Sequence, residues 1–173
     1  DLYVQMVNEA VAELKGEPIR EPAEVKIETP VAAHLPPDYV EREELRLEAY
    51  RRLAAVTTES EVDDIAAEWA DRYGPIPDPA RTLLDVARLR AECHRLGIAE
   101  VTVIPGDGFM GPAFKARVSP LSLKASQAVR LKRIAPKAVH KPDSGLLEVP
   151  MAKGSDPNVD LVAFLRHLLP PGD

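Results

Sequence analysis

The sequence is poor in the residues on which many metal and redox sites depend. It has one cysteine, four histidines and one tryptophan in 173 residues, and aromatic residues make up 5% of the chain. Zinc sites need several Cys or His ligands close together, whereas the histidines are dispersed and Cys93 stands alone. Within a helix, Cys93 is expected to pack as a small apolar side chain. We therefore expect no metal site and no cofactor site in this chain.

The motifs that bind nucleotides or activate a serine are also missing. The sequence contains no GxxxxGK[ST], GxGxxG or GxSxG pattern. The nearest approach, Gly106-Asp107-Gly108, lies between two strand patterns, where it is typical of a hairpin turn. We therefore predict that the chain is not a catalyst. An enzyme would remain conceivable if the fold placed His94 or His140 beside carboxylates in a pocket.

Long apolar runs are lacking too. No stretch approaches the roughly 20 apolar residues of a membrane span, and no signal-peptide pattern is present. With 45% apolar and 29% charged residues, the composition is that of a globular protein. We expect a cytoplasmic protein that does not contact a membrane. Because the chain starts at Asp1 within a helical pattern, we expect it to be a piece of a longer polypeptide.

Three segments differ in pattern. Residues 1–16 carry apolar side chains at helical spacing and end at Gly16, which predicts a helix belonging to a preceding domain. Residues 17–40 contain several prolines around the alternating pattern of Val25 to Glu28, which predicts a linker with one short strand. Residues 41–173 hold the remaining periodic segments and are expected to form the main domain.

Helical patterns dominate the first part of this domain. A helix is expected over residues 41–55. The next should begin near Thr58, which forms a capping-box pair with Glu61, and end where Gly74 allows a left-handed conformation. Asp78 is then expected to cap a helix that runs to Leu96.

Strand and helix patterns alternate in the rest of the chain. Strands are expected over 100–104, 113–118, 138–141 and 146–149, a helix over 120–134, and a last helix capped by Asp156 or Asn158. Two hairpins imply antiparallel pairing. The predicted fold class is therefore α+β, with three helices followed by a ββαββα second half.

Charge is unevenly distributed along the chain. The net charge is −6, yet residues 109–142 hold eight Lys or Arg and no acidic residue. On the predicted helix after Thr58, acidic residues recur at steps of three and four, which places them along one ridge: Glu61, Asp64, Glu68 and Asp71. This acidic ridge is either a solvated helix face or a docking surface for a basic partner.

The basic segment has two similar interpretations. Its cations could neutralise phosphates of a nucleic acid, although few aromatic residues are interleaved with them for base stacking. It could equally be a solvated face, or one paired with the acidic half of the chain. The candidate nucleic-acid contacts are Lys124, Arg130, Lys132 and Arg133.

Several segments of the first hundred residues share the pattern of one family. They are Leu2 to Met6, Glu24 to Ile27, Leu35 to Val40, Leu47 to Ala54, Asp71 to Asp78 (DRYGPIPD) and Pro79 to Leu89. Together they resemble the C-terminal domain of bacterial transcription-repair coupling factors, from residue 1 to about Ile98. The excess of arginine over lysine and the abundance of alanine indicate a high-G+C bacterium.

The resemblance implies a non-catalytic part of a larger protein. Parent proteins of this family are cytosolic ATP-driven DNA translocases that use ATP and Mg, displace stalled RNA polymerase and recruit UvrA in nucleotide excision repair. Residues 1–16 would then be the last helix of the translocase part. The remaining domain would fold back on the N-terminal UvrB-like module of the same protein, mask its UvrA-binding surface and autoinhibit the translocase.

The resemblance also singles out residues at the corner after the acidic ridge. In the family, acidic positions before the RYG corner face a basic partner surface, and here these are Glu68 and Asp71, with Asp64 and Arg72 as weaker candidates. Gly74, in the same corner, is expected to be structural.

Overall fold

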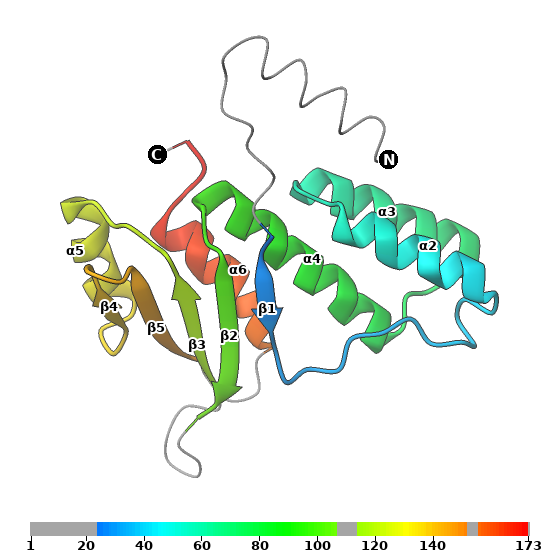
Figure 1. Cartoon of the computed structure of the whole chain (residues 1–173), viewed down its shortest axis with the longest axis horizontal. Helices are drawn as coiled ribbons and strands as arrows, with labels where there is room; N and C mark the ends of the chain where they lie inside the picture. The colour runs from blue at the N-terminus through cyan, green and yellow to red at the C-terminus, as the bar shows by residue number, and fades with distance from the viewer. Residues whose placement is uncertain (1–23, 107–113, 152–155, 173) are drawn as a thin grey trace.

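The computed structural model describes residues 24–106, 114–151 and 156–172, which form an α+β fold (Figure 1). The predicted fold class is confirmed. Within the described residues lie β1 (Lys26–Glu28), α2 (Glu43–Ala54), α3 (Glu59–Tyr73), α4 (Asp78–Leu96), β2 (Glu100–Pro105), β3 (Phe114–Ser119), α5 (Ala125–Ile134), β4 (Val139–Lys141), β5 (Leu146–Met151) and α6 (Pro157–Leu168).

The strands form one mixed sheet in the order β1-β2-β3-β5-β4. The two predicted hairpins, β2–β3 and β4–β5, are both present, and β3 joins them by pairing antiparallel with β5. The short strand β1 adds to the other side of β2 in parallel, with Ile27 opposite Val101. A parallel partner is possible here because three helices separate β1 from β2 in the chain.

One face of the sheet packs against helices α4 and α6, which lie behind it in Figure 1. Alternate strand residues point to this face, so Val101, Ala116 and Leu147 are each at most 1% exposed. They meet Leu89 and Cys93 from α4, together with the leucines of α6. Cys93 is fully buried, which confirms its expected packing role, and burial raises the pKa of its thiol to about 12.

A second apolar cluster lies among α2, α3 and the first half of α4. Val62, Ile65 and Trp69 form the buried face of α3, as the helical spacing predicts. They pack with Leu84 of α4 and Leu53 of α2. Helix α4 has 19 residues and is therefore about 28 Å long. It contributes to both clusters, so it connects the helical end of the molecule to the sheet.

Helix α3 begins and ends where the sequence predicts. Thr58 is its N-cap, and the Thr58 hydroxyl accepts a hydrogen bond from the backbone N–H of Glu61. Gly74 follows the last turn at φ 89° and ψ −163°. This is an extended conformation with positive φ, which is essentially restricted to glycine, rather than the left-handed helical one expected from sequence. The left-handed conformation occurs instead at Gly97, directly after α4.

Three predicted helix starts are wrong. Helix α2 begins at Glu43 rather than Glu41, after an extended Arg42. Helix α4 has Pro77 as its N-cap, and Asp78 is its first helical residue and makes no side-chain cap bond. Residues 120–124 are not helical, and α5 begins at Ala125, where the Gln127 side chain accepts a hydrogen bond from the Lys124 backbone.

Other predicted boundaries can be compared only in part. The last helix is capped by Asp156, whose carboxylate accepts from the backbone N–H of Asn158 at 2.9 Å. The predicted helix over residues 1–16, the first part (residues 17–23) of the linker predicted over 17–40, and the turn after Gly106 lie outside the described residues. Within the described ranges, no helix combines the length and the apolar character that crossing a bilayer would require.

Candidate partner-binding surface

The corner between α3 and α4 is held by Tyr39, which comes from the segment before α2. Its hydroxyl donates to the carbonyl of Gly74 at 2.9 Å and contacts the carbonyl of Trp69 at 3.2 Å. Both carbonyls lie at the C-terminal end of α3, where Gly74 is the C-cap. The Tyr39 ring packs edge-to-face on Tyr73, with the ring centroids 5.6 Å apart. Burial, and secondarily the neighbouring Tyr73, raises the pKa of Tyr39.

Glu68 lies at the centre of the acidic ridge and is bound by two arginines. Arg52 from α2 donates to one carboxylate oxygen, and Arg72 from the next turn of α3 lies 3.4 Å from the other. These bonds lower the pKa of Glu68, the largest contribution coming from the Arg52 hydrogen bond. The three side chains remain partly exposed, at 33% for Glu68, 45% for Arg52 and 47% for Arg72. Glu68 therefore presents a neutralised cluster rather than a bare negative charge.

The other ridge carboxylates have different surroundings. Glu61 accepts hydrogen bonds from the hydroxyls of Thr58 and Thr57, and the bond from Thr58 is the main reason that its pKa is lowered. Asp64 and Asp71 are exposed and form no ion pair with any residue that the structure describes. They are the two ridge charges available to a partner.

Arg72 has two contacts that fix its direction. Besides Glu68, its guanidinium lies over the ring of Tyr73, 5.3 Å from the ring centroid. The distance is within the range of a cation–π interaction. Helix α3 thus carries all four partner-binding residues predicted from the sequence: Glu68, Asp71, Asp64 and Arg72. A shallow hollow between α3 and α2 is lined by Arg52, Glu68 and Arg72.

The basic segment lies at the opposite end of the molecule. Figure 1 places α5 and β4 at one end of the long axis, and α2 and α3 at the other. Arg130 of α5 donates to the carbonyl of Leu168 at 2.7 Å and so closes the end of α6. Arg117 pairs with Glu148 across the strands at 3.1 Å. Of the candidate nucleic-acid contacts, Arg130 therefore has a structural role, while Lys124, Lys132 and Arg133 are exposed.

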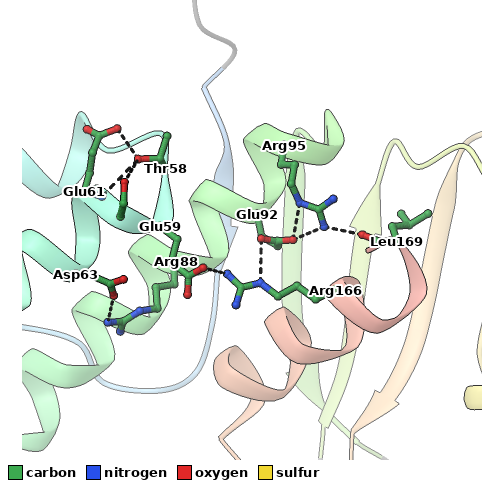
Figure 2. A network of polar contacts seen from close by, with 10 residues as sticks. Thr58, Glu59, Glu61, Asp63, Arg88, Glu92, Arg95, Arg166 and Leu169 are labelled. Carbon is green, nitrogen blue, oxygen red and sulfur yellow. Dashed lines mark hydrogen bonds and ion pairs between the residues drawn. The ribbon is translucent and has the colours of Figure 1, made fainter. Parts of the chain in front are cut away.

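A polar network between α4 and α6 was not found from the sequence. The Glu92 side chain is only 6% exposed and accepts hydrogen bonds from Arg95 and Arg166 (Figure 2). Arg95 also donates to the carbonyl of Leu169 at 2.7 Å, and Arg166 bonds Glu59 at the start of α3. The partners lie up to 107 residues apart in the chain, so no local pattern signals the network.

The histidines do not form an acid–base pair in the described part of the chain. The ring Nε2 of His140 lies 2.7 Å from the carbonyl of Leu121, a backbone partner. His94 lines a groove that Glu24 also lines, and no hydrogen bond joins them. No group of three or more His, Cys, Asp or Glu able to hold a metal ion occurs in these described ranges.

The fold and its surface define a class: an α+β domain with a charged helical corner at one end and a cation-rich helix at the other. Comparison with known proteins then identifies the family. Residues 29–121 match the TRCF domain model. Transcription-repair-coupling factors from Mycobacterium bovis and Mycobacterium tuberculosis are each 43% identical over 98% of this chain, and the Escherichia coli one is 37% identical over 69%.

The chain therefore belongs to the TRCF domain family of transcription-repair coupling factors, as the sequence resemblance indicated. It spans only 14% of the length of the mycobacterial relatives and 11% of the Escherichia coli one. The fold is also shared with a solved structure, described as the C-terminal domain of transcription-repair coupling factor. That likeness has a TM-score of 0.69 at 16% identity and covers 87% of this chain and 94% of the solved one.

Proposed function

We propose that this domain docks on the N-terminal UvrB-like module of its parent protein through the exposed side of α3. In this arrangement it masks the UvrA-binding surface of that module and restrains the translocase until RNA polymerase is engaged. The observation that carries the proposal is a pair of exposed carboxylates, Asp64 and Asp71, which form no ion pair with a described residue and lie on the same helix as the arginine-bound Glu68. A basic partner surface would complement them.

The geometry favours a contact that can be released. Exposed ion pairs contribute about 0–1 kcal/mol each and act mainly on orientation and association rate. Glu68 and Arg72 already satisfy each other, so breaking a contact with a partner leaves neither group buried without a counter-charge. The hydrogen bond from Tyr39 to the Gly74 carbonyl fixes the end of α3 within this domain and involves none of the proposed partner-binding residues. Such a surface suits a docking contact that a competing partner can displace.

The test is calorimetric titration of this chain against the separately produced UvrB-like module. We expect the double variant Asp64→Arg, Asp71→Arg to weaken binding at least about tenfold, because two attractive pairs become repulsive. The matched control is Glu100→Arg, Asp143→Arg, which makes the same charge change at exposed positions away from α3. Equal weakening by both pairs, or no binding by the folded native chain, would reject the proposal.

A second candidate function is binding to the DNA backbone through the opposite end. The exposed cations of α5 and the residues around it form no ion pair with a described residue: Lys124, Lys132, Arg133, Lys137 and Lys141. The affinity for duplex DNA should then fall steeply with salt, and Lys132→Gln, Arg133→Gln should reduce that slope by up to about two. Indifference to DNA at low salt would remove this function.

A further inference from the structure

An arginine that forms no hydrogen bond and no ion pair with a described residue lines an apolar groove between α2, α4 and β1. The groove has a volume of about 410 Å³. Val25, Ala54 and Val56 supply its apolar wall, and Val25 and Val56 are themselves buried. Arg90 and His94, one turn apart on α4, supply its polar side. The volume lies within the range of about 300–1,000 Å³ that is typical of ligand pockets.

Arg90 is the unusual member of this groove. Its guanidinium has five N–H donors, yet it makes no hydrogen bond and no ion pair with any residue that the structure describes. The neighbouring arginines of α4 differ in this respect, because Arg88 bonds Asp63 and Arg95 bonds Glu92. Burial lowers the pKa of Arg90 in spite of the nearby Cys93 and Glu24. Burial of Arg90 is thus only partly offset by Glu24 and Cys93, and no described residue accepts a hydrogen bond from its guanidinium.

A partly buried, unpaired cation is costly for a folded protein. A carboxylate can offset that cost by accepting two parallel hydrogen bonds from the guanidinium fork. The apolar wall selects for a neighbouring apolar side chain, since burial of such a side chain contributes in proportion to its area. Glu24, which also lines the groove, weakens the attraction for a second carboxylate but forms no hydrogen bond with Arg90.

We propose that this groove is a docking site for a peptide segment of a partner protein, in which an acidic residue lies next to a leucine-like side chain. The carboxylate would pair with Arg90, and the apolar side chain would fill the space between Val25, Ala54 and Val56. The site is separate from the acidic ridge of α3 and selects the opposite charge. It therefore does not depend on the docking proposed above.

The test uses two capped peptides, acetyl-Leu-Asp-Leu-amide and acetyl-Leu-Asn-Leu-amide, titrated into the 15N-labelled 173-residue chain. We expect saturable shifts of the backbone amides of residues 54–57, 90 and 94. The aspartate peptide should bind about tenfold more tightly than the asparagine peptide, which is the effect of one charged hydrogen-bonded pair. Similar affinities for both peptides, or no saturable shift in the folded chain, would overturn the proposal.

Two variants and a control locate the effect. Arg90→Gln should abolish the preference for the aspartate peptide, whereas Arg133→Gln, the same change on α5, should leave it intact. Glu24→Gln should strengthen binding of the aspartate peptide, because it removes a competing negative charge. This variant retains Arg90, so it still tests the site if Arg90→Gln does not fold. An unchanged affinity in Glu24→Gln together with an unchanged preference in Arg90→Gln would remove the groove as the site.

Other occupants give different outcomes. Concentration-dependent dimerisation in sedimentation experiments, lost in Arg90→Gln, would assign the groove to a second copy of the chain and overturn the peptide proposal. The same holds if a duplex oligonucleotide shifts the amides of residues 54–57 and 90 while neither peptide does. In either case Arg90 would serve a partner of another class.

Discussion

Arg166 of α6 donates from its Nε to a carboxylate oxygen of Glu92 in α4, with the two atoms 3.3 Å apart. Glu92 also binds Arg95, and Arg166 also binds Glu59 at the start of α3. The network links residues of three helices, α3, α4 and α6 (Figure 2). Because Glu92 is buried, its two arginines are required to neutralise it.

Replacing Glu92 by Gln should therefore lower the free energy of unfolding by about 1–3 kcal/mol, since Arg95 and Arg166 lose their shared counter-charge. The arginine side chains are 30% and 34% exposed, so water compensates part of the loss. Urea unfolding measures the change. Arg42→Gln is the control, because its pair with Glu44 is 72% and 75% exposed and should contribute less than about 0.5 kcal/mol. Equal effects of both substitutions would contradict a structural role for the network.

Tyr39→Phe tests the corner that positions the acidic ridge. The substitution removes the hydroxyl that donates to the carbonyl of Gly74 and leaves the ring packing on Tyr73 in place. We expect a loss of about 0.5–1.5 kcal/mol in the free energy of unfolding, the usual net value of one hydrogen bond. Chemical denaturation at neutral pH measures it. An unchanged stability would mean that water replaces the hydroxyl at no cost.

The difference between wild type and Tyr39→Phe should also depend on pH. The pKa of Tyr39 is raised above 10.0 in the folded chain, so the unfolded chain releases this proton first. The stabilisation is therefore complete below pH 10 and is lost as the pH rises through the folded pKa. Unfolding midpoints of the two proteins, followed from pH 8 to 11, should approach each other as the pH rises above 10. A constant difference across this range would contradict the raised pKa.

Glu68 should show the opposite dependence on pH. Its pKa is lowered from 4.5 in the folded chain, first by the hydrogen bond from Arg52. The ion pairs therefore stabilise the fold above pH 4.5, and this contribution is lost as the pH falls through the folded pKa. At pH 7, Glu68→Gln should cost about 0–1 kcal/mol because the cluster is partly exposed. Denaturation curves of variant and wild type should approach each other as the pH falls below 4.5, and a difference that grows on acidification would reject this account.

The parts of the fold that follow local rules could be predicted from the sequence. The hydroxyl of Thr58 caps α3, and Gly97 ends α4, because each depends on a few adjacent residues. The start of α5 could not be predicted, because the apolar spacing of residues 120–124 is also compatible with a helix. In the structure the helix begins only at Ala125. The parallel pairing of β1 with β2 depends on contacts across more than 70 residues and has no local signal.

In the candidate site, too, features set by local spacing could be predicted, whereas features set by the packing of distant segments could not. Helical spacing places Asp64, Glu68 and Asp71 on one ridge, and the structure has all three on α3. That Arg52 neutralises Glu68 depends on how α2 packs against α3, which spacing does not reveal. The unpaired state of Arg90 is likewise a property of the packed fold, because arginines on the same helix at positions 88 and 95 do find partners.

Arg90→Met should stabilise the chain, in contrast to most substitutions of partly buried residues. Methionine keeps the length and apolar contacts of the arginine stem and removes a desolvated charge to which no described residue is joined by a hydrogen bond or an ion pair. We expect a gain of about 0.5–2 kcal/mol in the free energy of unfolding, typical where a protein maintains a group for binding rather than stability. Arg88→Met on the same helix is the control. It breaks bonds to Asp63 and Asp85, at 3.0 and 3.5 Å, and should cost about 0.5–1.5 kcal/mol. Urea unfolding of both variants distinguishes the two cases, and destabilisation by Arg90→Met equal to that by Arg88→Met would show that the fold itself uses Arg90.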